Sequence, residues 1–403
     1  MAGRYLLAML AGAFGIAIAL AALTWFVDPL AIHGSPRIEG FNALKPALKG
    51  RARIFKTVNA VQGRWPCLIV GTSRAETGLD ARHEYFRATP CFNAALGGQP
   101  YEESLRLVQA AAAKGGLRRV VALLDFGVAN AHYEPPADFV ADNYRPWRPA
   151  ALAFNLEMVG QALMTPLRQD EVALRDDQAL WLADGQFVYP PPSKGHRALA
   201  LASEAGYFEK NYFRGPGLEF SLETAASHPL RHVRDLVAFA HANGIELVIV
   251  IAPAHARQWE TIADAGLWDE WEEWKRRLVS INEEEAAKAR KPSFALWDFA
   301  DYGDIASEPF PQAGDTRSRM RWYFESSHFT PAAGDLLLDR IAGKEPSGFG
   351  VRLEPPMLEP HLSAIRDARR AWRERYPADA AEVERIARAA ASVRDARRHR
   401  IVH

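Results

Sequence analysis

Residues 67–74 read Cys-Leu-Ile-Val-Gly-Thr-Ser-Arg, and this stretch indicates the fold of the chain. The apolar run 68–70 has the length of a buried parallel strand, and Gly71-Thr72 predicts a turn directly after it. Ser73 is therefore expected at the carboxyl end of a strand, where open α/β sheets bind ligands. This makes Ser73 a candidate nucleophile, although a short stretch of this kind is more often a simple turn.

Four further apolar runs repeat the pattern along the chain, at 92–96, 120–124, 247–251 and 294–297. Helix-forming segments lie between them. One is 102–113, and another is 232–242, which Gly244 follows as a helix-ending residue. Strands that alternate with helices predict a parallel sheet covered on both faces. The expected fold is therefore α/β, with three layers (αβα) around a parallel sheet of about five strands.

The composition excludes several classes of protein. The 403 residues exceed the roughly 250–300 at which a single core stops growing, so insertions or a second domain are expected. Forty-nine Lys and Arg balance 49 Asp and Glu, so no basic surplus is present for binding nucleic acid. Two cysteines cannot form a disulfide-rich scaffold or a four-thiolate zinc site, and we expect no metal ion or other cofactor.

Residues 5–27 are 23 consecutive residues without a charge. A helix of this length spans the ~30 Å hydrocarbon core of a bilayer, and Asp28-Pro29 would end it. A cleaved signal peptide is the alternative, because 19–21 reads Ala-Leu-Ala and matches an A-x-A site. We favour an uncleaved anchor, since the apolar run continues past that site. The flanking charges do not determine the orientation of the helix.

The sequence predicts four parts of the chain, of which the α/β domain is the largest. Residues 1–28 are the anchor, 29–65 an approach segment, 66–345 the α/β domain and 346–403 a tail of two amphipathic helices separated by Pro377. More than a hundred residues separate the third and fourth strands, so about 130–230 is expected to be an inserted subdomain. Acidic residues interleave with the arginines of the tail. This pattern favours a solvated face packed on the core over a surface for a partner or membrane.

A second candidate element is 324–331, Phe-Glu-Ser-Ser-His-Phe-Thr-Pro. Thr330 is a favourable N-cap and Pro331 a favourable first helical residue, which places His328 in the loop just before a helix. Glu325 lies three residues upstream and can bond one ring nitrogen, which leaves the other to take a proton from a hydroxyl. For a histidine considered alone, a loop residue bonded to a neighbour is the more common case.

Two further features lie at the same predicted sheet edge. Gly97 and Gly98 follow the second strand, where backbone N–H groups can approach a ligand as an oxyanion hole requires; an ordinary turn is the alternative. His255 follows the fourth strand and has either a substrate-binding or a structural role. Zinc is not expected there, because no cluster of His, Cys and carboxylate accompanies it.

Cys67 and Cys91 each directly precede one of the first two strands. Adjacent parallel strands lie ~4.8 Å apart, within the usual Cα separation of a disulfide. The pair is therefore expected either as a disulfide or as two buried free thiols. A disulfide would indicate an oxidising compartment.

Together, Ser73, Gly98 and His328 resemble the sequence blocks of the SGNH (GDSL-like) hydrolase superfamily, in matching order across roughly 65–343. In that family a serine after strand one, a glycine after strand two and a late D-x-x-H form one esterase site. More closely, the chain resembles membrane-anchored bacterial SGNH-like proteins. The shared elements are Asp-Pro at 28–29, Gly-Phe-Asn at 40–42, Gly-Thr-Ser-Arg at 71–74 and Trp-Tyr-Phe-Glu-Ser-Ser-His-Phe-Thr at 322–330. A similar pattern of anchor and site residues appears in alginate-type O-acetyltransferases and in the anchored protein that helps place D-alanine on teichoic acids.

Two departures from the family pattern stand out. Glu325 occupies the position where the family usually has Asp. The third block, Gly-x-Asn-Asp, is missing, and 123–127 reads Leu-Leu-Asp-Phe-Gly instead. The side-chain oxyanion donor is therefore unassigned, with Asn93 and Asn130 as candidates and Asp125 expected to brace the loop. Loss of one such donor raises the barrier by ~3–4 kcal/mol.

The resemblance implies a single-pass protein of the bacterial inner membrane with its globular domain in the periplasm. Its expected activity is that of a serine esterase or O-acyltransferase acting on acyl groups, acetyl in the first place, of a cell-envelope glycan. Ser73, His328 and Glu325 would be catalytic, and the oxyanion and substrate would be held by Arg74, Gly98, Asn93 and His255. Expected partners are the membrane, an acylated glycan or acyl donor, and a multi-pass acyl-transfer membrane protein. The alternative is a non-catalytic glycan-binding or assembly subunit of SGNH-like fold.

Overall fold

The computed structural model describes residues 1–170, 180–213, 218–344 and 348–402. The chain divides into two compact units: Met1–Gly63, Ala137–Ala183 and Phe187–Pro190 form the first, and Arg64–Pro136, Asp184–Gln186 and Pro191–His403 form the second. The segment expected as one insertion at about 130–230 contributes to both units. The expected boundary at 345 and parts of that segment (171–179 and 214–217) lie outside the described residues.

The first unit contains the expected apolar helix. This helix, α1, spans Ala2–Val27 and is long and apolar enough to cross a membrane. Asp28 ends it in a left-handed conformation (φ 49°), and its carboxylate accepts the backbone N–H groups of Ile32 (2.8 Å) and His33 (3.1 Å). The helix thus stops in a local hydrogen-bonded turn, as the Asp-Pro pair predicts.

The last carbonyl of α1 is capped by side chains from the following segment. Lys45 Nζ donates to the Val27 oxygen at 2.9 Å, and Asn42 Nδ2 reaches the same oxygen at 3.3 Å. Carbonyls at a helix end have no intrahelical partner, so these donors satisfy a group that would otherwise be buried unpaired. Burial lowers the pKa of Lys45 to about 8, against the opposing effect of Asp28.

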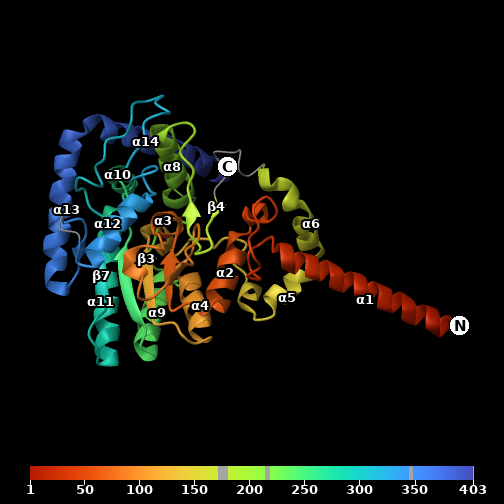
Figure 1. Cartoon of the computed structure of the whole chain (residues 1–403). Coiled ribbons are helices and arrows are strands. Elements are labelled where there is room, and N and C mark those ends of the chain that lie inside the picture. The colour runs from red at the N-terminus through yellow and green to blue at the C-terminus, as the bar shows by residue number, and fades with distance from the viewer. Residues whose placement is uncertain (171–179, 214–217, 345–347, 403) are drawn as a thin grey trace. The chain divides into compact units, whose positions relative to one another are not determined.

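The other elements of the first unit are short. α5 (Arg148–Ala153) and α6 (Leu156–Met164) pack against α1 (Figure 1). α2 (Ala52–Gln62) lies in the predicted approach segment, 29–65. Short turns of helix and one antiparallel strand pair complete the unit: η1 (Pro46–Leu48), η4 (Ala141–Tyr144), η5 (Pro166–Arg168), β4 (Leu180–Trp181) and β5 (Phe187–Val188).

The second unit is built on a mostly parallel six-stranded sheet, which confirms the predicted α/β class. Its strands run in the order β2-β1-β3-β6-β7-β8, where β8 alone is antiparallel. The five parallel strands match the five predicted runs, although the second is shorter than expected. The strand bounds are β1 Cys67–Gly71, β2 Cys91–Asn93, β3 Arg119–Leu124, β6 Glu246–Ile251, β7 Ala295–Asp298 and β8 Val351–Arg352.

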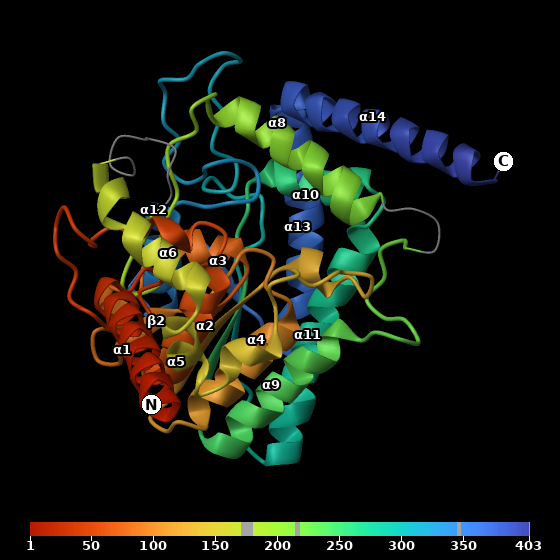
Figure 2. The same cartoon turned by 90° about the vertical axis from the view of Figure 1, so that its right-hand side faces the viewer.

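Helices cover both faces of this sheet. One core contains alternate strand residues such as Ile69 and Val121 together with residues of α3 (Ser73–Gly78) and α12 (Pro331–Ile341). On the other side α4 (Tyr101–Ala112), α9 (Pro229–Asn243) and α11 (Trp268–Ala289) lie side by side (Figure 2). The alternation follows from the two-residue period of a strand.

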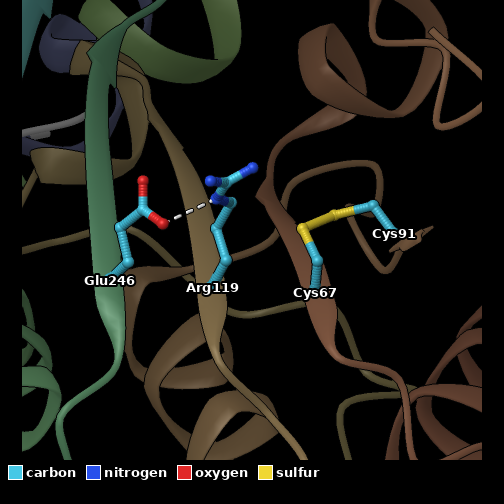
Figure 3. Close-up of a disulfide and its surroundings, with 4 residues drawn as sticks. All are labelled: Cys67, Cys91, Arg119 and Glu246. Carbon is cyan, nitrogen blue, oxygen red and sulfur yellow. Dashed lines mark hydrogen bonds and ion pairs between the residues drawn. A yellow bond between two sulfur atoms is a disulfide. The ribbon is translucent and has the colours of Figure 1, made fainter. Parts of the chain in front are cut away.

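A disulfide joins Cys67 and Cys91 at the amino ends of β1 and β2, with Cα atoms 4.3 Å apart. Figure 3 shows Arg119 and Glu246 beside it, at the same end of β3 and β6, with Arg119 Nε 2.8 Å from the Glu246 carboxylate. These links join β1 to β2 and β3 to β6 at the end of the sheet opposite to Ser73.

Ion pairs join the carboxyl-terminal helices α13 (Pro355–Arg375) and α14 (Pro377–Val402) to the rest of the second unit. The fully buried Arg257 of α10 (Ala256–Asp264) bonds Glu204 of α8 (His196–Tyr207) at 2.7 Å, and Asp379 and Glu382 of α14 at 2.9 and 2.8 Å. These helices are therefore packed parts of this unit.

Candidate active site

Ser73 lies where β1 turns into α3, at the carboxyl end of the sheet. Gly71 permits this turn: it has φ +149°, and a Cβ there would come 2.5 Å from the Leu123 carbonyl oxygen. Thr72 caps α3 by accepting the Arg74 N–H at 3.4 Å, and its hydroxyl donates to Asp125 at 3.1 Å. The turn that carries Ser73 is therefore held from the neighbouring strand β3.

The structure brings Ser73 and His328 together across 255 positions of sequence. His328 Nε2 lies 2.7 Å from Ser73 Oγ, and His328 Nδ1 bonds the Glu325 carboxylate. Because that carboxylate accepts a hydrogen bond from Nδ1–H, the proton stays on Nδ1. Nε2 is then left with a lone pair that faces the serine hydroxyl. This arrangement of hydroxyl, imidazole and carboxylate has the geometry of a relay that can activate a serine as a nucleophile.

Glu325 is buried and held as an anion. Its oxygens accept the Ser327 N–H (2.9 Å), the Ser327 hydroxyl (2.7 Å) and the His328 N–H (2.8 Å). Burial acts to raise the pKa of Glu325, but the charge and hydrogen bond of His328 and the serine hydroxyls outweigh it and lower the pKa to about 2. The longer arm of Glu in place of Asp therefore still reaches and orients the ring.

Two glycines let the serine helix and the histidine loop approach closely. A Cβ on Gly334, in α12, would overlap the Gly78 carbonyl oxygen of α3, and a Cβ on Gly78 would overlap the Phe329 ring. Since Ser73 begins α3 and His328 lies three residues before α12, this contact sets their separation. Neither glycine was singled out by the sequence analysis.

One face of α8 supports the histidine loop, and the sequence analysis missed it. His196 bonds the Phe324 carbonyl at 2.9 Å, and Ser203 bonds Glu325. The Tyr207 hydroxyl bonds Ser327 and lies 3.4 Å from Arg74 Nη2. Positions 196, 203 and 207 share a helical face, so a polar stripe in the expected insertion was the available signal.

Arg74 is buried beside Ser73 and paired with Asp125. Its Nε lies 3.1 Å from the Asp125 carboxylate, just past the carboxyl end of β3. Although burial acts to lower the pKa of Arg74, Asp125 and Tyr207 raise it above its ordinary value. Asp125 thus braces the turn, as expected, by binding Thr72 and Arg74.

Asn93 does not supply an oxyanion donor, contrary to the expectation. Its amide nitrogen donates to the carbonyls of Ala75 and Leu79, each at 2.9 Å, and its side-chain oxygen accepts the Ala95 N–H at 3.2 Å. The side chain is fully buried and both amide protons are used. Asn93 therefore fixes α3 to the end of β2. The other candidate, Asn130, uses its oxygen to accept the N–H groups of His132 and Ser221.

His255 is likewise structural, which is the second of the two roles that the sequence left open and not the substrate-binding one. Its Nδ1 accepts the Arg257 N–H at 3.2 Å and caps α10, while Nε2 bonds the Glu308 carbonyl at 2.7 Å. Burial lowers the pKa of His255 to about 3. Both ring nitrogens are therefore used within the protein, and the backbone N–H of His255 helps to hold the Ser326 carbonyl at 3.0 Å.

Two backbone N–H groups, which follow β1 and β2, remain as candidate oxyanion donors. The N–H of Ser73 belongs to the first turn of α3, where no intrahelical acceptor exists. Gly98 has φ +61°, and its carbonyl accepts the Tyr133 hydroxyl at 2.8 Å; among the described residues its N–H meets no acceptor. Within that same part of the chain, no three His, Cys, Asp or Glu side chains are grouped to hold a metal ion.

Comparison of the chain with models of protein families, with curated proteins and with solved structures found no match. The chemical interpretation of the site therefore depends on its geometry.

Proposed function

We propose that the protein is a membrane-anchored, periplasmic SGNH-like serine esterase or O-acyltransferase that acts on acyl groups, acetyl in the first place, of a cell-envelope glycan. The single observation that carries the proposal is the chain of bonds from Ser73 through His328 to Glu325. The position of Ser73 at the carboxyl edge of a mostly parallel sheet supports it, since such sheets bind ligands there.

The first step forms an acyl-serine. Ser73 Oγ attacks the ester carbonyl while its proton passes to His328 Nε2, and the resulting imidazolium is stabilised by Glu325. The C–O bond to the departing alcohol then breaks, and that oxygen takes the proton from His328. In the second step a sugar hydroxyl or water loses its proton to Nε2 and attacks the acyl-serine carbonyl. The acyl–Oγ bond then breaks, and Ser73 Oγ takes the proton back from Nε2. Transfer and hydrolysis differ only in this acceptor.

The oxyanion would be held by the backbone N–H groups of Ser73 and Gly98. Arg74 is paired with Asp125 and bonded to Tyr207, so it braces the turn that presents the Ser73 N–H. Preoriented backbone donors contribute most where water is excluded, and Thr72 and Arg74 on either side of Ser73 are buried. These donors would offset in part the absence of a third-block asparagine.

An intact α1 would anchor the domain in the membrane. The end of α1 is integrated into its unit through Asp28, Asn42 and Lys45, and cleavage after Ala21 would cut the helix two turns before this cap. The Cys67–Cys91 disulfide favours an oxidising compartment such as the periplasm. A multi-pass membrane protein that supplies the acyl group would be a fitting partner.

A non-catalytic glycan-binding or assembly subunit is the second candidate. The observation that favours it is the use of Asn93 within the fold, which removes one of the two side-chain amides expected to bind the oxyanion. Removal of one oxyanion donor from an acyl-transfer site costs ~3–4 kcal/mol, enough to leave little hydrolysis.

Hydrolysis of p-nitrophenyl acetate distinguishes the two candidates. An enzyme should show turnover that Ser73→Ala and His328→Gln abolish, while Ser392→Ala, a change at an exposed serine of α14, leaves it unaltered. Equal background rates for wild type and Ser73→Ala across the pH range would contradict the enzymatic proposal and support the binding subunit.

A further inference from the structure

Outside α1, the exposed large apolar side chains are concentrated in one stretch of the first unit. The set comprises Trp147, Phe154, Leu156, Leu163, Met164 and Leu167, with exposed fractions between 47% and 80%. By contrast, the described residues of the second unit expose only scattered side chains of this kind, such as Met357 at 51%. The clustered side chains lie on and around α5 and α6, and we call them the α6 apolar face.

α6 is apolar on two opposite sides. Met158, Val159 and Ala162 are buried within the unit, while Leu156, Leu163 and Met164 point away from it. The helix carries one charge, Glu157, which is ion-paired with Arg51. Apolar side chains on both the inward and the outward side of a helix are typical of a protein core or a bilayer. The inward side of α6 meets the core of its unit, so its outward apolar side chains are suited to a bilayer.

The position of α6 beside α1 identifies that solvent. The buried residues of α1 are Ala21, Thr24 and Val27, which all lie in its last two turns, and α5 and α6 both contact this helix (Figures 1 and 2). The 26 residues of α1 measure about 39 Å, whereas the hydrocarbon core is ~30 Å thick. When α1 spans the bilayer, its last turns therefore lie at the membrane interface, and α6 lies at the same depth.

We infer that α5 and α6 form a membrane-interfacial surface, with the α6 apolar face immersed in lipid beside the end of α1. The occupant of this face is the acyl-chain boundary of the bilayer, because the face is continuous with the lipid-exposed surface of the anchor. Interfacial helices of this kind bury their apolar side ~5–10 Å into the boundary. The first unit would thus hold the anchor with two short helices lying on the membrane, independently of any catalytic activity.

Site-directed spin labelling of the full chain in phosphatidylglycerol–phosphatidylethanolamine vesicles tests this inference. Both native cysteines form the disulfide, so Leu163→Cys provides a single labelling site. Phe14→Cys, within α1, is the reference for lipid, and Met357→Cys, on an exposed position of α13, is the matched control for water. The measurement is accessibility of the label to oxygen, which concentrates in lipid, relative to a water-soluble nickel chelate.

The inference predicts that the oxygen-to-nickel ratio at position 163 exceeds that of Met357→Cys severalfold and approaches that of Phe14→Cys. A ratio equal to that of Met357→Cys would overturn it, whatever the label in α1 shows. Dipolar broadening between labels at position 163 at low protein-to-lipid ratio would also overturn it, because a second copy would then cover the face. Lipid-like accessibility without broadening supports the bilayer as the occupant.

Discussion

The carboxylate behind the histidine gives the sharpest quantitative prediction. Glu325→Gln keeps the size of the side chain but removes the charge that orients and stabilises the His328 ring. The pKa of Glu325 falls from 4.5 to about 2, which corresponds to about 3 kcal/mol of stabilisation of the carboxylate. Loss of that interaction with an imidazolium slows the reaction roughly 10²–10³-fold, and a wrong ring tautomer extends the loss toward ~10⁴-fold.

The assay is the second-order rate constant for labelling by a fluorophosphonate, followed beside hydrolysis of p-nitrophenyl acetate. Glu308→Gln is the matched control, because the Glu308 carboxylate accepts the N–H groups of Arg321 (2.6 Å) and Trp322 (2.8 Å) in the same loop. That variant should lower stability without the large rate loss. Glu325→Asp should retain more activity than Glu325→Gln. An unchanged labelling rate in Glu325→Gln would refute the assigned role.

The same carboxylate makes stability depend on pH. Its folded pKa is depressed, so its contribution is complete above the unfolded value of about 4.5 and is lost as pH falls toward about 2. Glu325→Gln should therefore destabilise the fold at pH 7 and have little effect near pH 2. Denaturant unfolding at both pH values measures this, and an equal cost at the two would contradict the assigned charge.

Further predictions concern packing, the disulfide and a buried histidine. Gly334→Ala should lower the free energy of unfolding by ~1–3 kcal/mol and displace the histidine loop, so that fluorophosphonate labelling falls on the order of 10²-fold. Gly206→Ala, where a Cβ meets no atom within 4 Å, should leave labelling intact. Equal labelling of the two variants would contradict the close-approach argument. Replacing Cys67 and Cys91 by Ser should lower the free energy of unfolding by about 3 kcal/mol, given their 24-residue separation. Reductant should then have no further effect on stability. An unchanged unfolding midpoint in the double variant would argue against the disulfide. His255 has a depressed pKa of about 3, so its contribution to the free energy of unfolding, up to about 5 kcal/mol, is complete above pH 6.5 and is lost as pH falls toward 3. His255→Gln should therefore flatten the dependence of stability on pH between 6.5 and 3. An unchanged slope of stability against pH would contradict this.

The sequence was sufficient to predict the α/β class, the five parallel strands and the apolar amino-terminal helix. Buried parallel strands read as short apolar runs, and a charge-free stretch of 23 residues has few other interpretations. β8 escaped prediction because two residues carry no periodic signal. The β4–β5 pair escaped for the same reason.

The candidate site could be predicted only in part. The order of Ser73, Glu325 and His328 along the chain indicated residues that the structure places in one hydrogen-bonded chain. The sequence could not show that Asn93 and His255 bond within the fold, because partners such as the Ala75 and Glu308 carbonyls are set by tertiary packing, which spacing along the chain does not encode.

The close contact between α3 and α12 could not be predicted from the sequence either. Gly78 and Gly334 lie 256 positions apart, and each reads as an ordinary glycine of a helical segment. Their importance follows only from the backbone of one helix lying against the other. Tyr207 likewise lies near Ser327 and Arg74 only because α8 packs there. The sequence around Tyr207 contains no strand pattern or motif that could have predicted this contact.

Mapping the fluorophosphonate adduct by mass spectrometry tests the central claim most directly. The account predicts one covalent adduct on the folded wild-type protein, carried by Ser73, and its absence from His328→Gln under the same treatment. An adduct located on another residue, or equal labelling of Ser73 with and without His328, would contradict activation of that hydroxyl by the imidazole.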